Sequence, residues 1–300
     1  MIVGVGASAG GLEAFSQLLQ ALPPDPGVAI VLVQHLAPQH ESALPTLLSG
    51  RTDLAVVQAT EGVRVEPNHV YVIPPNVQMG VRDSRLHLLP RPSDRSQYTP
   101  IDYFLRSLAE SLHHRAVAVI LSGTASDGTV GVREIKAVGG LTIAQRPDTA
   151  RYDGMPRAAI ATGFVDLILP PEEIAAELVR ISGHPLERRG RSTTTADEGE
   201  KQVPSSEREL DQVFQLLRTA TGVDFRPYKR PTIERRLHRR MVLQRLAAVE
   251  QYLQLLKENP AEVQALYRDI LIHVTRFFRE PESFREIAAN VLPRILESRR

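Results

Sequence analysis

Near the start of the chain, Ser8 follows an apolar run and stands between glycines. Residues 6–10, GASAG, have the G-x-S-x-G spacing of a strand-to-helix turn that presents a nucleophilic serine. Residues 4–9, GVGASA, also have the G-x-G-x-x-A spacing of a loop that binds a dinucleotide. One short stretch is thus compatible with covalent catalysis, with phosphate binding or with a simple turn.

The dinucleotide interpretation makes a second demand on the sequence. An acidic residue should lie about 20 residues further on, at the end of the next strand, to bind the ribose hydroxyls. The next apolar run ends with Gln34 and His35, and no Asp or Glu follows it before Glu41. We therefore expect no NAD site, while an anion on the amides at the helix start is kept as a minority alternative.

A nucleophilic serine needs a base, and a carboxylate that orients the base. His35 ends the second apolar run, and Asp127 lies in a Gly-rich turn, LSGTASDGT, after a later one. Because the carboxyl ends of parallel strands meet at one edge of a sheet, Ser8, His35 and Asp127 are predicted to form a catalytic triad. Their order along the chain differs from the Ser-Asp-His order of α/β-hydrolases.

Each of the three residues also has a structural alternative. Ser8 and Asp127 each precede a helical segment and could serve as its N-cap. His35 could be a core histidine that bonds to a backbone carbonyl. The placement of all three at strand ends favours catalysis over these separate roles.

The pattern of apolar runs predicts the fold that would position these residues. Up to about residue 181, β-branched runs typical of buried parallel strands alternate with amphipathic helical segments. Residues 63–76 and 77–90 alternate polar and apolar side chains around turn residues, which indicates antiparallel hairpins. We expect an α/β fold: a doubly wound, mostly parallel sheet with a β-hairpin insertion, followed by a linker and a small all-α domain.

The length of 300 residues suggests about two domains. Residues 184–206 have almost no large apolar side chains and are predicted to be a flexible linker. The α/β domain would then comprise residues 1–183. Residues 207–300, in which every periodic segment is helical, would form the all-α domain.

Composition excludes several classes of site. The chain has no cysteine, so it has no disulfide, thiolate metal site or cysteine nucleophile. Its longest apolar runs are far shorter than the roughly 18 residues that span a bilayer. We expect no metal site, no membrane insertion and a cytoplasmic location. Residues 1–181 carry 14 Lys and Arg against 18 Asp and Glu, whereas residues 182–300 carry 22 against 17.

The basic half contains one strongly basic helical segment, residues 229–241, KRPTIERRLHRRM. At about 100° per residue, its apolar side chains share one face and its arginines the opposite one: Ile233, Leu237 and Met241 against Arg235, Arg236, Arg239 and Arg240. The arginine face could be solvated, dock on an acidic partner helix, or bind nucleic acid. Without interleaved aromatics to stack bases, nucleic acid is the least favoured of the three.

Several motifs together resemble a known family. The chain resembles, over about residues 1–181, the catalytic domain of the chemotaxis receptor methylesterases (CheB-type), on the motifs GASAGGLEA, VQHL, VYVIPPN, LSGTASDGTVGVREIKAVGG and YDGMPRAAIATGFVD. The resemblance implies a triad at Ser8, His35 and Asp127 that needs no cofactor. It implies hydrolysis of γ-glutamyl methyl esters on the cytoplasmic domain of chemoreceptors, and deamidation of certain receptor glutamines. The family's usual Thr after the serine is Ala9 here, and the Met and Asn of its Asp loop are Thr124 and Ser126.

Residues from about 208 to 300 resemble the N-terminal helical region of the chemoreceptor glutamate methyltransferases (CheR-type), on the stretches FQLLRTATGVDFRPYKRPTIERRLHRRM and ILIHVTRFFREPESF. This resemblance implies receptor docking, and places Thr275 and Arg279 near S-adenosylmethionine, with His273 where the family has Asn. The α/β cofactor domain of that family is absent from these residues. S-adenosylmethionine is therefore expected to act only if a complete methyltransferase domain follows.

The resulting hypothesis is a protein-glutamate methylesterase and glutamine deamidase joined to a receptor-binding helical domain. Its expected partner is a chemoreceptor, with a sensor kinase as a second candidate and no nucleic acid. The alternative is a catalytically degenerate scaffold that positions a glutamate methyltransferase in a signalling complex.

Overall fold

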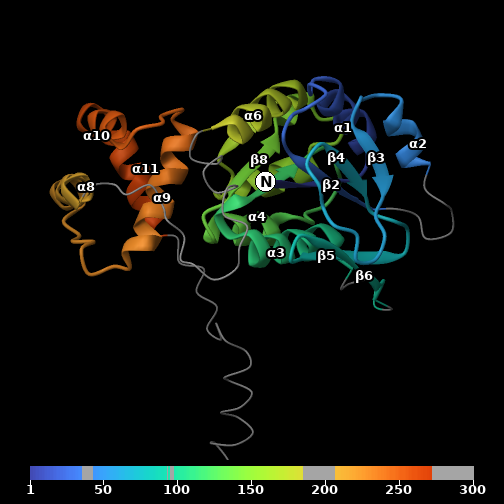
Figure 1. Ribbon diagram of the computed structural model, residues 1–300, viewed down its shortest axis with the longest axis horizontal. Helices are drawn as coiled ribbons and strands as arrows, with labels where there is room; N and C mark the ends of the chain where they lie inside the picture. Colours follow the sequence, from blue (N-terminus) through green and yellow to red (C-terminus); the bar gives the residue numbers. More distant parts are fainter. Residues whose placement is uncertain (36–42, 93, 95–97, 185–206, 272–300) are drawn as a thin grey trace, which may run out of the picture.

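The protein is described by a computed structural model, which comprises an α/β region up to residue 184 and a helical region, residues 207–271, beside it (Figure 1). The described residues are 1–35, 43–92, 94, 98–184 and 207–271. Residues 185–206, which make up nearly all of the predicted linker, lie outside them, so the flexibility of the linker stays a prediction.

Seven strands form one sheet in the order β3-β4-β2-β1-β7-β8-β9, and every pair of neighbours is parallel. The strands are β1 (Ile2–Ala7), β2 (Ala29–Gln34), β3 (Ala55–Gln58), β4 (His69–Val72), β7 (Ala116–Ile120), β8 (Leu141–Gln145) and β9 (Leu167–Leu169). Every residue of β1, β7 and β8 is buried, which explains why their sequences are nearly continuous apolar runs. The predicted α/β fold with a parallel sheet is confirmed.

One of the two predicted hairpins is wrong. Within residues 63–76 the structure has β4, which lies between β2 and β3 and pairs with both in parallel. Pro67 precedes this short strand and Pro74 and Pro75 follow it, so these prolines bound a strand instead of closing a hairpin. β3 at the sheet edge was not predicted, because its four residues are mostly exposed and carry no buried periodicity. The second hairpin is confirmed: β5 (Val77–Arg82) and β6 (Arg85–Pro90) are antiparallel.

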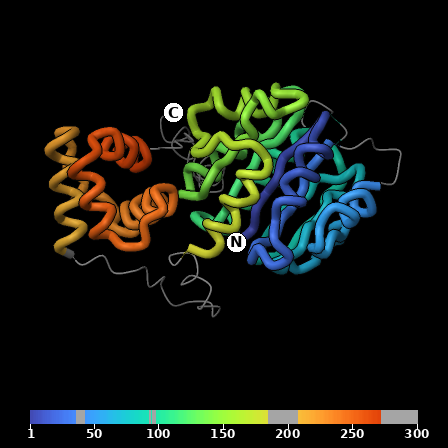
Figure 2. Tube along the Cα trace, turned by 90° about the horizontal axis from the view of Figure 1, so that it is seen from above, coloured from blue at the N-terminus to red at the C-terminus, as the bar shows by residue number. Residues whose placement is uncertain are grey.

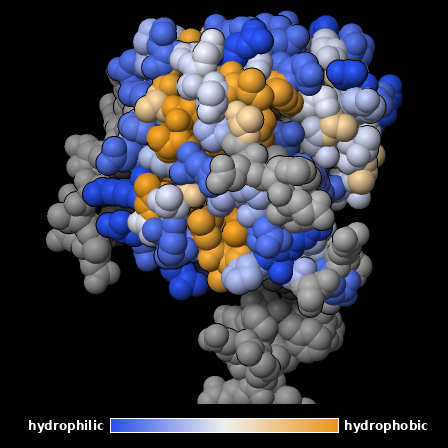
Figure 3. Space-filling view, turned by 90° about the vertical axis from the view of Figure 1, so that its right-hand side faces the viewer, coloured by the Kyte–Doolittle hydropathy of each residue, from blue (hydrophilic) through white to orange (hydrophobic). Residues whose placement is uncertain are grey.

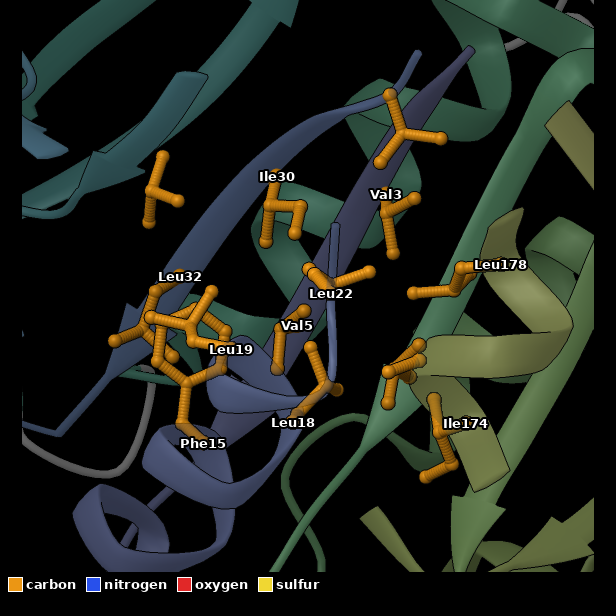
Figure 4. Close-up of a cluster of buried hydrophobic side chains, with 14 of the residues drawn as sticks. Val3, Val5, Phe15, Leu18, Leu19, Leu22, Ile30, Leu32, Ile174 and Leu178 are labelled. Atoms are coloured by element: carbon orange, nitrogen blue, oxygen red, sulfur yellow. The ribbon is translucent and has the colours of Figure 1, made fainter. Parts of the chain in front are cut away.

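Helices cover both faces of the sheet. On one face lie α1 (Gly11–Gln20) and α6 (Pro171–Gly183), whose apolar side chains meet those of β1 and β2 in a continuous core (Figure 4). The other face is covered by α3 (Pro100–Leu112), α4 (Thr129–Ala137) and α5 (Gly154–Ala161). The remaining short elements are α2 (Leu44–Ser49), η2 (His113–Arg115) and η3 (Pro147–Thr149).

The glycines of β1 allow α3 to pack closely on the sheet. A Cβ at Gly4 would lie 2.8 Å from Leu105 Cδ2, and a Cβ at Gly6 would lie 2.4 Å from Ile101 Cγ2. Real side chains do not approach so closely, so both positions require glycine for packing. The G-x-G spacing that resembled a dinucleotide loop is thereby explained by helix–strand contact.

The helical region has a core of its own. It consists of α8 (Glu207–Thr221), α9 (Arg230–Leu243), α10 (Val249–Glu258) and α11 (Pro260–Ile270), which lie together on one side of the α/β region (Figures 1 and 2). Leu217, Phe225, Leu237, Tyr252 and Leu266 are fully buried among them. None of the described helices is long and apolar enough to cross a membrane.

Apolar side chains also gather on part of the surface. Figure 3 shows them on the face that lies at the right of Figure 1, the side of α2 and β3. Leu47 on α2 and Val57 on β3 are among the exposed large apolar residues. Residues 36–42, which precede α2, lie outside the described residues.

Candidate active site

Ser8 and His35 leave the sheet side by side. β1 and β2 are parallel, and the last pair in their register is Ala7 with Gln34, so Ser8 and His35 are the next residues of the two strands. β1 also pairs with β7, and the Ser8 amide donates to the carbonyl oxygen of Ser122, just past β7, at 3.0 Å. Three chain segments therefore converge at one edge, as the strand-end argument predicted.

His35 and Asp127 are in direct contact. The Nε2 atom of His35 lies 3.1 Å from Oδ2 of Asp127, and the histidine side chain is 31% exposed whereas the aspartate side chain is 6% exposed. A buried carboxylate is thus paired with a ring that reaches solvent. Because Nε2 faces the carboxylate, Nδ1 is the ring nitrogen left to exchange a proton with a substrate or nucleophile. The structural alternative for His35 was a bond from its ring to a backbone carbonyl. At Nε2 the structure has the Asp127 carboxylate instead.

The carboxylate of Asp127 is held by the first turn of α3. Its Oδ2 accepts from the amide of Ile101 at 3.1 Å, and its Oδ1 accepts from the amide of Asp102 at 2.9 Å. Both donors are backbone amides at the start of the helix, and together they fix the position and orientation of the carboxylate. The following helix, α4, has Gly128 as its N-cap and no side-chain cap. The alternative that Asp127 caps the helix after it is therefore wrong.

Ser8 does not cap a helix either. The N-cap of α1 is Gly10, in the left-handed conformation at φ 69°, and no side chain caps this helix. A Cβ at Gly10 would lie 2.7 Å from Ser122 Oγ, so glycine is required here by both conformation and space. The Ser8 carbonyl accepts from the amide of Gly11 at 2.9 Å, which closes a tight turn behind the serine.

That turn decides which amides are available to a substrate oxygen. The residues after the serine provide three candidate donors for an oxyanion, the amides of Ala9, Gly10 and Gly11. The Gly11 amide already donates to the Ser8 carbonyl, which excludes it as a donor to a substrate. Of the three candidates, the amides of Ala9 and Gly10 are the pair that this turn leaves to a ligand. Ser122 fixes the same turn from the other side, because its hydroxyl donates to the carbonyl of Ala9 at 2.9 Å.

Asp102 is a site residue that the sequence analysis missed. Its amide binds Asp127, and its own Oδ1 accepts from the amide of Gly131 in the first turn of α4 at 2.7 Å. Asp102 therefore ties α3 to α4 on either side of the Asp127 turn. Burial, with a smaller contribution from the charge of Asp127, raises the pKa of Asp102 to about 6. An acidic residue in the first turn of a predicted helix was the signal that could have pointed to it.

Gly123 lies between the side chains of Met155 and Ser8. A Cβ at Gly123 would lie 2.1 Å from Met155 Sδ and 3.0 Å from Ser8 Cβ, so only glycine lets these two side chains flank this position. Met155 is fully buried, and its amide donates to the Gly123 carbonyl at 2.9 Å. Position 124, where the related family has a methionine, is an exposed Thr here, and the thioether of Met155 beside the serine was not predicted.

A tyrosine stands edge-on to the histidine. The rings of Tyr98 and His35 have centroids 6.4 Å apart and an angle of 73° between their planes. The Tyr98 hydroxyl donates to the carbonyl of Val77 at 3.1 Å, and the Arg91 guanidinium lies 3.9 Å from the centre of its ring. Burial raises the pKa of Tyr98, so the hydroxyl is a hydrogen-bond donor at neutral pH. The hairpin β5–β6 thus supports the wall of the site beside His35.

A sequence model of the family described as CheB methylesterase matches residues 3–178, which is more than half of the chain. The chain belongs to the CheB methylesterase family. A second model, described as CheR methyltransferase, all-alpha domain, matches residues 208–271. The order of the two matches is the one that the sequence motifs predicted.

Relatives of this CheB family member span different lengths. A protein of Myxococcus xanthus named protein-glutamate methylesterase/protein-glutamine glutaminase 1 is 36% identical over 186 residues, or 61% of this chain and 54% of its own. An uncharacterized 104.1 kDa protein in the hypE 3′ region of Rhodobacter capsulatus is 38% identical over 265 residues, 83% of this chain and 28% of its own. The chain spans between about a quarter and about half of the length of these two curated relatives.

The fold agrees with a solved structure of the same family. The crystal structure of the Thermotoga maritima CheB methylesterase catalytic domain matches with a TM-score of 0.56 and 32% identity, over 60% of this chain and 97% of that one. As for other ligands, no group of three or more His, Asp or Glu among the described residues is arranged to hold a metal ion. The positions associated with S-adenosylmethionine, Thr275 and Arg279, together with His273, lie outside the described residues.

Proposed function

We propose that this chain hydrolyses γ-glutamyl methyl esters on proteins, with Ser8 as nucleophile, His35 as general base and Asp127 as the residue that orients the base. The observation that carries the proposal is the contact of His35 Nε2 with the buried carboxylate of Asp127, at the sheet edge where the register places Ser8 beside His35. Membership of the CheB methylesterase family supports the choice of ester.

The first step is acylation of the serine. Nδ1 of His35 accepts the hydroxyl proton of Ser8 as Oγ forms a bond to the ester carbonyl carbon. The resulting imidazolium is stabilised through Nε2 by Asp127, whose carboxylate is held in place by the amides of Ile101 and Asp102. The imidazolium then returns the proton to the departing oxygen, and methanol leaves.

The second step regenerates the enzyme. A water molecule gives its proton to the same ring nitrogen and attacks the acyl carbon, which releases the free glutamate and the Ser8 hydroxyl. The same sequence with a glutamine substrate releases ammonia and gives deamidation. Several relatives carry both activities in their names, protein-glutamate methylesterase and protein-glutamine glutaminase.

The developing oxyanion needs donors that are already in place. The amides of Ala9 and Gly10 precede α1, so the positive end of its dipole adds to their field. The left-handed Gly10 lets the chain turn tightly into α1, and Ala9 adds only a methyl group beside these amides.

The substrate of this chain is proposed to be the methylated cytoplasmic part of a chemoreceptor, in the cytoplasm. The helical region would assist in placing the chain in a chemoreceptor or sensor kinase complex, and no step of the proposed hydrolysis uses S-adenosylmethionine or a metal.

The test is methanol release from a methylated chemoreceptor fragment by the purified chain. We expect methanol to accumulate while mass spectrometry shows the methylated peptides converted to free glutamates. A folded chain that leaves the esters unchanged would contradict the proposal and would favour a scaffold that positions a methyltransferase.

A further inference from the structure

Two arginines of the basic helix are buried against the α/β region. Arg236 and Arg239 on α9 are only 5% and 4% exposed. Solvation, docking on an acidic partner helix and binding of nucleic acid, the three interpretations of this side of the helix, each need accessible arginines. Because Arg236 and Arg239 are buried in this structure, all three interpretations are wrong for these two residues.

Arg236 binds the carboxyl end of α4. Its Nη1 donates to the carbonyl of Lys136 at 2.7 Å, and its Nη2 donates to the carbonyl of Ala137. The last carbonyls of a helix have no partner within the helix and carry the negative end of its dipole, so a guanidinium is well matched to them. Arg239 extends this contact, because its Nε donates to the carbonyl of Gly140 at 2.9 Å.

A buried cluster of four charges joins the two regions. Lys136 and Asp166 belong to the α/β region, whereas Arg239 and Asp269 belong to the helical region. Arg239 pairs with both aspartates, and Lys136 pairs with Asp166 and lies 3.4 Å from Asp269. Each region supplies one cation and one anion, and separation would leave these groups to be solvated anew.

Apolar and rim contacts complete the interface. Val242, near the end of α9, is 3% exposed and belongs to the core cluster that contains Ile174 and Leu178 of α6. At the edge, Arg245 lies 3.6 Å from Glu177 of α6, and the Arg245 side chain is mostly exposed. The interface therefore combines a buried cluster of charges with an apolar contact and an exposed ion pair at its edge.

We propose that Arg236 and Arg239 of α9 form an intramolecular docking surface, occupied by the α/β region, and that an acidic peptide partner can reach these two arginines only by displacing that region. The carboxylates and carbonyls on Arg236 and Arg239 are the groups that an acidic peptide would offer. A buried guanidinium cannot bind the groups of the α/β region and those of a peptide at the same time, so the two occupants compete. The helical region would then exist in a docked state and in a released, partner-bound state.

The docking half of the proposal is tested on the full chain with a protease site introduced within residues 185–206. After cleavage, the two pieces should co-elute on gel filtration at micromolar concentration. Arg236→Gln removes a cation whose partners are backbone carbonyls, so it leaves no unpaired buried charge and should weaken association at least tenfold. Arg239→Met should weaken it by more. Arg235→Gln is the matched control, since Arg235 bonds within α9 to Thr232, and its pieces should stay together.

The docking would be overturned if the wild-type pieces separated. It would also be overturned if the Arg236→Gln and Arg239→Met pieces associated as strongly as the wild-type pieces. Circular dichroism of each variant before cleavage shows that both regions are folded.

The competition half uses poly-L-glutamate as the acidic probe on the cleaved wild-type complex. We expect poly-L-glutamate to release the helical piece in a concentration-dependent way, beyond the effect of sodium chloride at the same ionic strength. A complex that stays intact with the probe, or release no greater than salt alone produces, would overturn the competition. Neither readout involves ester hydrolysis, so failure of the proposed function and failure of this inference are distinguishable.

Discussion

The carboxylate of Asp127 accepts hydrogen bonds from the amide of Asp102 at 2.9 Å and from the amide of Ile101, while it faces His35 at 3.1 Å. The first turn of α3 therefore fixes the residue that orients the proposed base. Two backbone amides hold the carboxylate whatever the state of the histidine, so the orientation of the acid is built before substrate arrives.

Asp127→Asn should keep the fold and lose most of the activity. The single oxygen of the amide side chain can still accept from one of the two backbone donors, but the side chain has no charge to stabilise the His35 imidazolium. We expect kcat for methyl ester hydrolysis to fall by roughly 10³–10⁴-fold. Ser126→Ala, at an exposed neighbour in the same turn, is the control and should leave kcat within about twofold. An Asp127→Asn variant with near-normal kcat would exclude the assigned role.

Gly6→Ala tests whether the G-x-G spacing serves packing. The new Cβ would lie 2.4 Å from Ile101 Cγ2, and overpacking of this kind costs roughly 1–3 kcal/mol in the free energy of unfolding. At Gly50 a Cβ would meet nothing nearer than 4.0 Å, so Gly50→Ala is the matched control and should not destabilise. Urea denaturation of both variants gives the comparison. Equal stability of the two would show that β1 tolerates a side chain beneath α3.

Ala125→Gly should stabilise the protein. Ala125 has φ 68°, in the left-handed region, where a Cβ costs about 1–2 kcal/mol that glycine avoids, partly offset by the greater freedom of glycine in the unfolded chain. We expect a net gain of about 0.5–1 kcal/mol in the free energy of unfolding. Ala150→Gly, at φ −89°, has no such strain to relieve and should lower stability instead. A loss of stability at position 125 would show that the turn is not strained there.

Asp102 should make stability depend on pH. Its pKa is raised from 3.8 to about 6 in the folded state, so folding favours the protonated carboxyl. The contribution of this group to the free energy of unfolding is therefore highest below about pH 4, falls between pH 4 and 6, and is constant above. Urea denaturation of wild type and Asp102→Asn across this range should show the decline in the wild type and a smaller decline in the variant. Parallel curves would mean that Asp102 titrates alike in both states.

The sequence was sufficient for the catalytic candidates because strand ends are readable from apolar runs. Ser8, His35 and Asp127 each follow such a run, and the register of β1 with β2 and β7 shows why that rule places them at one edge. The rule says nothing of side-chain partners. Asp102 and Tyr98 come from α3 and the segment before it, and only the folded packing of α3 on β1 brings them to the site.

The basic helix shows the opposite outcome. Its periodicity placed Ile233, Leu237 and Met241 on one face, and the structure buries that face in the core of the helical region. Arg236 and Arg239 are buried because their partners are distant in the sequence. Arg236 binds a carbonyl about 100 residues earlier, and Arg239 binds one aspartate about 70 residues earlier and another 30 residues later. No local pattern in the sequence indicates such partners. The sequence also could not show that the Gly11 amide donates to a carbonyl three residues before it, because this bond depends on the conformation of the turn.

The central claim is that Ser8 is the nucleophile of an ester hydrolase, and the most direct test is methanol release by Ser8→Ala and Ser126→Ala measured side by side with wild type on a methylated chemoreceptor fragment. We predict that Ser8→Ala loses at least about 10⁴-fold in kcat with an unchanged circular dichroism spectrum, while Ser126→Ala retains wild-type turnover. Near-wild-type methanol release by folded Ser8→Ala would contradict the account.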